Sequence, residues 1–473
     1  MASTAAPPFQ PPASQPARSL NALDATCVVI GGIVGVGIFF NPSSVAAIVH
    51  SDQLAMLAWA IGGLIALCGA FTFAELGARY FNSGAQYEVL RDAYGPMPAF
   101  LFVFCNATAI QAGAIGIIAI VCVHNLAVVA RFDAGPTTTA ALAAAIILTI
   151  ALANVLGTRS GATIQNLTVY AKIAALAAIT AIAAFFAPDT VPPLSAATAA
   201  SADAAARTLS PVSAVLAALV PVLFAYGGWQ QALWISGEVR NPRRNLPLAI
   251  TVGVAIVVTV YLLANWAYLR LLGVEDVAGS KALAADAVGV AFPGAGSRVI
   301  AGVVAVSAFG VLNSQLLTGP RLIYAMALDG RFFEWFGRLD PRRGTPARAI
   351  MLLATMSLVL LITARQNGLE RLLTGVVFID GVFFVATGAA LLVLRERRRA
   401  KAREALTSGI ATSAEPPTFR APGYPIVPLL FVIGELGVVV GAYLNPAVRE
   451  AALIGIAWIF AAAVLYWVRF RRP

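Results

Sequence analysis

Twelve stretches of mainly apolar residues, separated by short polar segments, are the feature that most constrains how this sequence can fold. A helix needs about 20 mainly apolar residues to cross the hydrocarbon core of a bilayer. Only 11% of the residues are charged, whereas about a quarter are charged in a soluble domain. The sequence therefore predicts an all-α, polytopic membrane protein with twelve transmembrane helices. We place the spans at 23–48, 54–79, 98–129, 137–156, 163–187, 212–236, 245–270, 298–327, 348–364, 369–394, 424–444 and 451–468.

The charged residues predict how the chain lies in the membrane. The chain has 32 Lys and Arg and 22 Asp and Glu residues, which gives a net charge of +10. Because the basic residues lie in short loops between spans, this charge does not indicate nucleic-acid binding. In our topology, 22 of the 32 basic residues lie on the side of both chain ends, and two, Lys172 and Arg321, fall within spans. Because cytoplasmic loops are enriched in Lys and Arg, we expect a cell inner membrane protein with both termini in the cytoplasm.

Residues 1–20 are rich in Pro, Ala and Ser and lack the features of a signal peptide. We expect a disordered cytoplasmic tail at 1–20 and one transmembrane domain at 21–473. The four cysteines lie in apolar runs without metal-ligand spacing, and two histidines do not make a metal site alone. Neither His-Glu-x-x-His nor Gly-x-Ser-x-Gly occurs, so we expect no enzyme activity, no metal and no cofactor.

Two spans carry sequences that weaken a helix. These are Gly31-Gly32-Ile33-Val34-Gly35-Val36-Gly37 in the first span and Phe224-Ala225-Tyr226-Gly227-Gly228-Trp229 in the sixth, with Pro221 upstream of the second. Glycine costs about 1 kcal/mol per helix-interior position relative to alanine, and irregular backbone at membrane depth persists only where it lines a cavity. Glycine also allows close helix packing, which is the alternative explanation for either cluster alone. Breaks at matching places in two halves indicate a transporter binding site and a five-plus-five inverted repeat.

At these residues the chain resembles the amino acid–polyamine–organocation transporter superfamily, and within it the L-amino-acid-transporter-like branch. The matching motifs are the first span ending in Gly37-Ile38-Phe39, the stretch 224–250 with Glu238-Val239-Arg240-Asn241-Pro242, Phe73-Ala74-Glu75-Leu76-Gly77 with Ser83-Gly84-Ala85, Asn313-Ser314 with Arg321-Leu322, and Phe419-Arg420-Ala421-Pro422-Gly423-Tyr424-Pro425. The resemblance implies a leucine-transporter-type fold with two extra C-terminal helices that works by alternating access.

The resemblance also implies where an amino acid would bind. The substrate carboxylate would contact the amides of Ile33, Gly35, Val36 and Gly37, and its amino group the carbonyls of Phe224, Ala225 and Gly227. Phe224 would be an aromatic gate over the site. The sequence departs from the family at Val36, where many relatives have Ser, so a side-chain hydroxyl is missing.

Ionisable side chains at bilayer depth are costly and are therefore functional candidates. In the family, a lysine at the place of Lys172 resembles a replacement for the second sodium ion of sodium-driven members, because its ammonium would hold carbonyls of the first span. The alternative is that Lys172 extends to the lipid headgroups. Asp380, midway along the tenth span, would approach the substrate side chain, where it would accept a proton or bind an amine. Its alternative is a protonated acid that caps a neighbouring helix.

Other polar residues within spans have less specific roles. Gln111 in the third span and Gln230 in the sixth are polar enough to line a pocket, although such residues often bond between helices. We expect Glu75 to be structural and Arg321 to extend to the headgroups, and we assign no role to Glu435.

The most consistent function is a sodium-independent amino acid transporter, either an exchanger or a facilitator. A proton-coupled symporter of cationic amino acids or polyamines is the alternative, and a channel or sensor on the same fold is a third. Heteromeric relatives bind an accessory subunit through a cysteine between the third and fourth spans. The loop 131–136 has no cysteine, so we expect no covalent accessory subunit.

Overall fold

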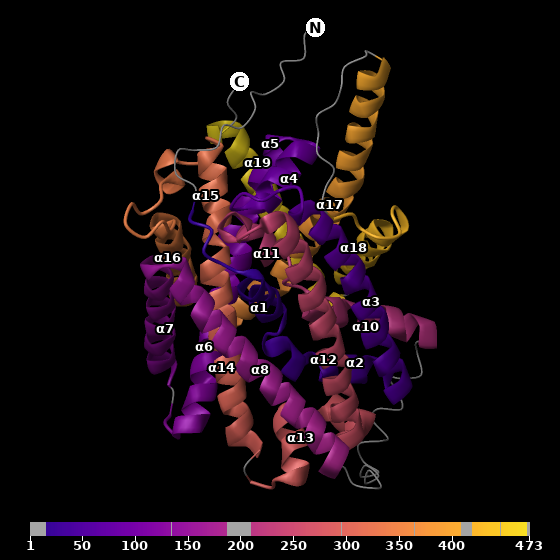
Figure 1. Cartoon of the computed structure of the whole chain (residues 1–473). Coiled ribbons are helices and arrows are strands. Elements are labelled where there is room, and N and C mark those ends of the chain that lie inside the picture. Colours follow the sequence, from indigo (N-terminus) through magenta and orange to yellow (C-terminus); the bar gives the residue numbers. More distant parts are fainter. Residues whose placement is uncertain are drawn as a thin grey trace.

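A computed structural model describes residues 16–133, 135–186, 210–294, 296–363, 365–407, 419–444 and 446–470. These residues form helices joined by turns, with one isolated bridge between Leu20 and Val239. Figure 1 shows long helices running side by side between two faces of the molecule. We call these the α4 face and the α13 face, after the short helices α4 (Ala85–Tyr94) and α13 (Leu283–Ala291) that lie at them.

The first half of the chain contains α1 (Ala22–Ile33), η1 (Val36–Phe39), α2 (Asn41–Val49), α3 (Asp52–Gly77), α4, α5 (Pro96–Cys105), η2 (Asn106–Gln111), α6 (Ala112–Ala130), α7 (Pro136–Leu156) and α8 (Thr158–Phe186). The second half contains α10 (Pro211–Tyr226), α11 (Gln231–Trp234), η3 (Ser236–Glu238), α12 (Pro242–Gly279), α13, α14 (Gly296–Thr318), α15 (Pro320–Leu328), η4 (Glu334–Gly337), α16 (Ala347–Thr363) and α17 (Arg365–Thr407). Two further helices, α18 (Ile426–Leu444) and α19 (Pro446–Leu465), precede η5 (Tyr466–Phe470).

The helices account for the twelve predicted spans. Ten of the described helical segments are long and apolar enough to cross a membrane. The other two spans are α16, which is apolar but shorter, and the interrupted first span made of α1, η1 and α2. The prediction of an all-α, polytopic fold is therefore confirmed.

The short helices reveal the inverted repeat. The amphipathic helix α4 follows the second span, and α13 follows the seventh, which is the corresponding place in the second half. Figure 1 shows them at opposite faces, as an inversion of the second half requires. The two interrupted spans, the first and the sixth, also occupy corresponding places.

The N-terminal boundary of the folded part differs from the prediction. Residues 1–15 lie outside the described residues, but Leu20, which we assigned to the disordered tail, is fully buried. Its amide donates to the Glu238 carbonyl (2.9 Å), and its carbonyl accepts from the Arg240 amide (2.8 Å). The tail boundary at residue 20 is therefore wrong, because this short segment finds main-chain partners more than 200 residues away in sequence.

Candidate functional site

The helix break in the first span exposes main-chain donors. Helix α1 ends at Ile33, Gly35 is extended (φ −103°, ψ −157°), and the 3-10 turn η1 begins at Val36. The Gly35 amide donates back to the Ile33 carbonyl (2.8 Å), and Ile33 itself still belongs to α1. Val36 and Gly37 head η1, and their amides have no main-chain partner among the described residues. Two of the four expected carboxylate donors are thus available without any rearrangement.

The break in the sixth span lies directly against the first. Helix α10 ends at Tyr226, Gly227 is extended, and Gly228 has φ +127°, a conformation that favours glycine. A Cβ atom on Gly228 would lie 2.3 Å from the Gly32 carbonyl oxygen, so both breaks meet main chain to main chain. The Phe224 carbonyl accepts from the Gly227 amide (3.2 Å), while the Ala225 and Gly227 carbonyls have no main-chain partner in the part of the chain that is described.

Lys172 holds the end of α1. Its side chain on α8 is 1% exposed, and its Nζ donates to the Val34 carbonyl (2.7 Å) and lies 3.5 Å from the Gly31 carbonyl. These carbonyls form the negative end of the helix dipole, so a cation stabilises them. The Tyr261 hydroxyl on α12 donates to the Ile33 carbonyl (3.0 Å) beside it. The ammonium therefore faces the first span and not the lipid headgroups, which rules out the alternative for Lys172 in this conformation.

A family model described as amino acid permease matches residues 20–470, which is nearly the whole chain and includes both breaks. The protein belongs to the amino acid permease family. It is 32% identical to the b(0,+)-type amino acid transporter 1 of Mus musculus, over 81% of this chain and 77% of the relative. It is also 26% identical to the serine/threonine exchanger SteT of Bacillus subtilis (strain 168), over 96% of this chain and 98% of the relative. The cystine/glutamate transporter of Homo sapiens is 27% identical over 80% and 74%, respectively.

The family confirms the predicted class of function. This amino acid permease is a multi-pass membrane transporter of amino acids and not an enzyme. Among the described residues, no group of His, Cys, Asp and Glu could hold a metal ion.

Beside the two breaks lies a buried glutamine that the sequence analysis did not select. Gln231, the first residue of α11, accepts from the Ser314 hydroxyl (2.6 Å) and packs against Gly32. The selected residue, Gln230, is also buried, and its Oε1 has no partner in the described structure. The motif FAYGGWQQ offers both glutamines equally, so only the rotation of α11 distinguishes them.

The remaining selected residues lie around the breaks at different depths. Val311 on α14 faces Gly35, whereas Gln111 packs against Gly319. Gly319 follows Val311 by eight positions, which corresponds to about 12 Å along a helix axis. Gln111 is therefore offset toward the α4 face. Phe224, the expected gate, is 50% exposed. Asp380 is partly buried on α17, and Glu435, buried on α18, interacts with it electrostatically.

Toward the α4 face, the permease is closed by a buried ion pair. Arg321 on α15 bonds to Glu238 in η3 through Nε–Oε1 (2.9 Å) and Nη2–Oε2 (3.1 Å), and both side chains are 0% exposed. Arg321 also donates to the Thr158 hydroxyl (3.2 Å) at the start of α8. The expectation that Arg321 extends to the headgroups is therefore wrong. A guanidinium with a bidentate carboxylate partner is stable inside the protein, where a lone arginine is not.

Glu75, which the sequence analysis expected to be structural, connects three segments of the chain. It lies fully buried near the end of α3 and bonds to Arg79, Arg395 and the Ala421 amide. The Arg395 Nε–Glu75 Oε1 distance is 2.8 Å, and the Ala421 amide lies 2.8 Å from Oε2. Glu75 thereby joins the second span, the tenth span and the segment before α18 at the α4 face.

Proposed function

We propose that this permease exchanges amino acids across the membrane by alternating access without sodium, and that the two facing breaks hold the substrate. The observation that supports the proposal is the contact between Gly32 and Gly228, which brings the two breaks together. In the described part of the chain, the Val36 and Gly37 amides of one break and the Ala225 and Gly227 carbonyls of the other have no main-chain partner. Amides attract a carboxylate and carbonyls attract an ammonium, so the pair matches a zwitterion. The substrate carboxylate binds Val36 and Gly37, with Ile33 and Gly35 adjacent. The amino group binds Ala225 and Gly227, with the Phe224 carbonyl after a small rearrangement.

Independence from sodium follows from Lys172. In this protein its ammonium already occupies the place at the α1 carbonyls that a cation would fill, and its side chain is buried. A bound sodium ion there would compete with a covalently attached charge at short range. We therefore propose that Lys172 replaces a coupling ion and does not leave the site with the substrate.

Exchange of neutral amino acids is supported by the name of one relative and by the apolar residues around the two breaks. The relative from Bacillus subtilis is by its name a serine/threonine exchanger, and it matches nearly the whole chain. We propose that Phe224 closes over the substrate from the α13 face, and that Gln230, Gln111 and Asp380 contact the side chains of substrates on their way through. Proton-coupled symport of cationic substrates is not favoured, since the relatives are named as exchangers or transporters of amino acids.

We further propose that the protein lies in the cell inner membrane with the α4 face and both termini in the cytoplasm. Several basic residues of the loops that we assigned to the cytoplasm lie at this face, including Arg79, Arg91 and Arg395. Cytoplasmic loops are enriched in such residues. The transporter domain then includes Leu20 and the residues after it, preceded by a cytoplasmic tail. The name of one relative, a large neutral amino acids transporter small subunit, indicates an assembly with another chain. All four cysteines here are buried and free, so we propose that this permease has no disulfide-linked partner.

The test is counterflow in liposomes that contain the purified protein. Labelled serine or alanine should accumulate transiently when the lumen holds unlabelled amino acid, and the rate should persist when choline replaces sodium. A pH gradient imposed on liposomes without internal amino acid should drive no accumulation. Uptake that requires sodium would end the Lys172 proposal, and single-channel currents in place of counterflow would end the proposal of exchange.

A further inference from the structure

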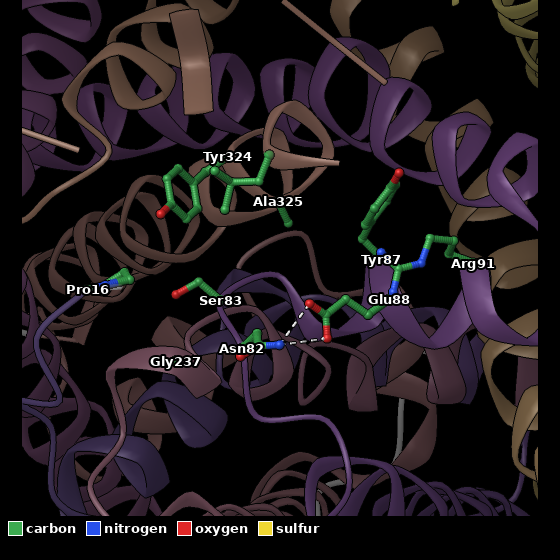
Figure 2. A pocket seen from close by; sticks show the side chains of 10 residues that line it. Pro16, Asn82, Ser83, Tyr87, Glu88, Arg91, Gly237, Tyr324 and Ala325 are labelled. Atoms are coloured by element: carbon green, nitrogen blue, oxygen red, sulfur yellow. Dashed lines mark hydrogen bonds between the residues drawn. The ribbon is translucent and has the colours of Figure 1, made fainter. Parts of the chain in front are cut away.

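A pocket separate from the central breaks opens at the α4 face. It lies between the turn that precedes α4, the helix α4 itself, η3 and α15. Its lining residues are Pro16, Asn82, Ser83, Tyr87, Glu88, Arg91, Gly237, Tyr324, Ala325 and Leu328. Its interior offers about 20 Å³ of space, which is room for one or two water-sized groups. Figure 2 shows the Ser83 hydroxyl directed toward Pro16, and the Glu88 carboxylate beside Asn82.

Two acceptors in this pocket have unused bonding capacity. The Ser83 side chain is 6% exposed, and its Oγ has no hydrogen-bond partner among the described residues. Glu88 is 7% exposed, and among the described residues its two carboxylate oxygens share a single donor, the Asn82 amide nitrogen (3.0 and 3.2 Å, Figure 2). A carboxylate offers about four acceptor positions, so most of its capacity is unused. A buried carboxylate with a neutral partner is costly, and a cation would relieve that cost.

The charges around Glu88 also favour a cation. Arg91 bonds to Asp329 (2.9 Å) and to Asp92 (3.0 Å), so two acidic groups already share its charge. Asp329 further accepts from the Tyr87 hydroxyl (2.7 Å), and Arg397 of α17 donates to the Asp92 carbonyl (2.7 Å). Three acidic side chains, Glu88, Asp92 and Asp329, thus surround one guanidinium. The lining of the pocket itself carries one carboxylate, Glu88, and one guanidinium, Arg91, whose charge is shared with Asp92 and Asp329 outside the lining.

We propose that this pocket binds the ammonium group of a small primary amine, through the Glu88 carboxylate and the Ser83 hydroxyl. A primary ammonium carries three N–H donors and a positive charge, which match one ionised acceptor and one neutral acceptor. Its size also matches the interior. A divalent metal ion is a poorer match, because calcium needs six to eight oxygen ligands and the pocket offers far fewer.

Occupation of the pocket would act on the closure of the α4 face. A Cβ atom on Gly237 would lie 2.5 Å from the Ser83 Oγ, and one on Gly84 would lie 2.6 Å from the Arg321 carbonyl oxygen. The turn that carries Ser83 therefore packs closely against η3 and α15. The Glu238–Arg321 ion pair joins these two elements. A cation bound between Ser83 and Glu88 stabilises this turn in its packed position. The ligand therefore favours the conformation that is closed at the α4 face.

Binding should depend on pH. Burial raises the pKa of the Glu88 carboxyl to about 7, against the opposing effects of the Asn82 hydrogen bond and the Arg91 charge, while Asp92 and Asp329 raise it further. The carboxylate form, which binds the ammonium, is therefore dominant at pH 8 and minor at pH 6. Its population changes about tenfold between these values.

The experiment titrates the purified full-length protein with methylammonium and follows its intrinsic fluorescence and melting temperature. The wild type should bind, with an affinity about tenfold higher at pH 8 than at pH 6. Glu88→Gln and Ser83→Ala should each weaken binding, the first by about tenfold or more because a charged hydrogen bond is lost. Glu396→Gln is the matched control, since Glu396 on α17 is exposed, pairs with Arg399 and does not line the pocket. It should bind as the wild type does.

Two further ligands separate the sources of the ammonium group. Tetramethylammonium has the charge but no N–H donor and should not bind. If alanine competes with methylammonium in the wild type, the natural ligand is an amino acid; if it does not, the ligand is an amine without a carboxylate. Equal affinities of Glu88→Gln and the wild type for methylammonium, or no binding by a folded wild type, would overturn the proposal. Either result leaves the counterflow test of exchange unaffected.

Discussion

Lys172 is a single side chain that stabilises an entire helix break. Its ammonium contacts the carbonyls that remain unpaired where α1 ends, and Tyr261 completes the set. Without this charge, the negative end of α1 would keep only neutral donors among the described residues, the Tyr261 hydroxyl and the Gly35 amide, both at the Ile33 carbonyl. A charge-assisted hydrogen bond contributes about 1.5–3 kcal/mol, so the effect of its loss is measurable.

We expect Lys172→Ala to abolish counterflow and to lower the melting temperature of the purified protein, because the α1 carbonyls lose their charged donor. Lys281→Ala is the matched control, since Lys281 is exposed in the loop before α13. The control should keep both properties. A Lys172→Ala protein that exchanges amino acids at the control rate would show that the lysine only fills space.

Glu88 predicts a pH dependence of stability in the absence of ligand. Its pKa is about 7 in the folded protein and near 4.5 in an unfolded chain, so the folded state binds more protons between these values. The contribution of Glu88 to stability is therefore largest at low pH and is lost as the pH rises through 7. Between pH 8 and pH 6, the free energy of unfolding should increase by about 1.4 kcal/mol from this group. Melting curves should show a gain on acidification that Glu88→Gln removes; an equal gain in the variant would assign it to other groups.

At the scale of single residues, sequence predicted some contacts and not others. Lys172 was predictable, because a lone lysine in an apolar helix needs carbonyls or headgroups, and the glycine-rich break supplies carbonyls. Gln231 was not, because one position along a helix turns a side chain by about 100° and the start of α11 after a break sets that rotation. Arg321 was predicted wrongly, because its partner Glu238 lies 83 residues away and no local pattern indicates their pairing.

At the scale of elements, the glycines of the two breaks differ in kind from those in continuous helices. Gly228 combines a positive φ with a main-chain contact to Gly32, so any side chain there meets both conformational strain and the Gly32 carbonyl. Gly113, near the start of α6, has open space where a Cβ would be. Replacement of glycine by alanine should therefore have opposite effects on the stability of the protein at these two positions.

We expect Gly228→Ala to abolish counterflow and to destabilise the protein, because the two breaks are forced apart. Gly113→Ala should leave counterflow unchanged and stabilise α6 by up to about 1 kcal/mol, the difference in helix propensity. Melting temperature and counterflow, measured in parallel, test both. A functional Gly228→Ala protein would show that the breaks need not touch, which removes the main support for the proposed binding site.

The breaks were predictable because glycine weakens a helix: the first span has four glycines in seven residues, and the sixth has Gly227-Gly228. The helix ends were less predictable. The tenth span continues beyond its apolar part as the basic end of α17, to Thr407, since nothing in that polar segment stops a helix. Leu20 joined the folded part because it pairs with the chain after η3, a tertiary contact that residues 1–20 do not reveal.

At the scale of the whole molecule, the inverted repeat explains why closure at one face accompanies opening at the other. The α4 face is closed by Glu238–Arg321, by the Glu75 cluster and by the packed turn at Ser83. Near the centre, Phe224, the expected gate, is half exposed. The structure thus has the character of a state that is closed at the α4 face, and the buried ion pair is the contact that must break for release on that side.

Breaking that pair should shift the population toward the state open at the α4 face. Thr318 on α14 is fully buried on the α4 side of the centre, so a cysteine there reports opening to that side, and the four native cysteines are themselves buried. Removing one partner of a buried ion pair costs about 3–5 kcal/mol, whereas the exposed Glu396–Arg399 pair contributes little. In Thr318→Cys protein, Glu238→Gln should therefore accelerate labelling by a membrane-impermeant maleimide by tenfold or more, roughly the effect of 1.4 kcal/mol, while Glu396→Gln leaves it unchanged.

Labelling should occur in inside-out vesicles, because we place the α4 face in the cytoplasm. A Phe224→Cys reporter should respond in the opposite sense, from the outside, since one binding site cannot be open to both faces during exchange. If Thr318→Cys reacts equally with and without Glu238, the ion pair does not hold the closed state, and if it reacts only in right-side-out vesicles, the orientation is reversed.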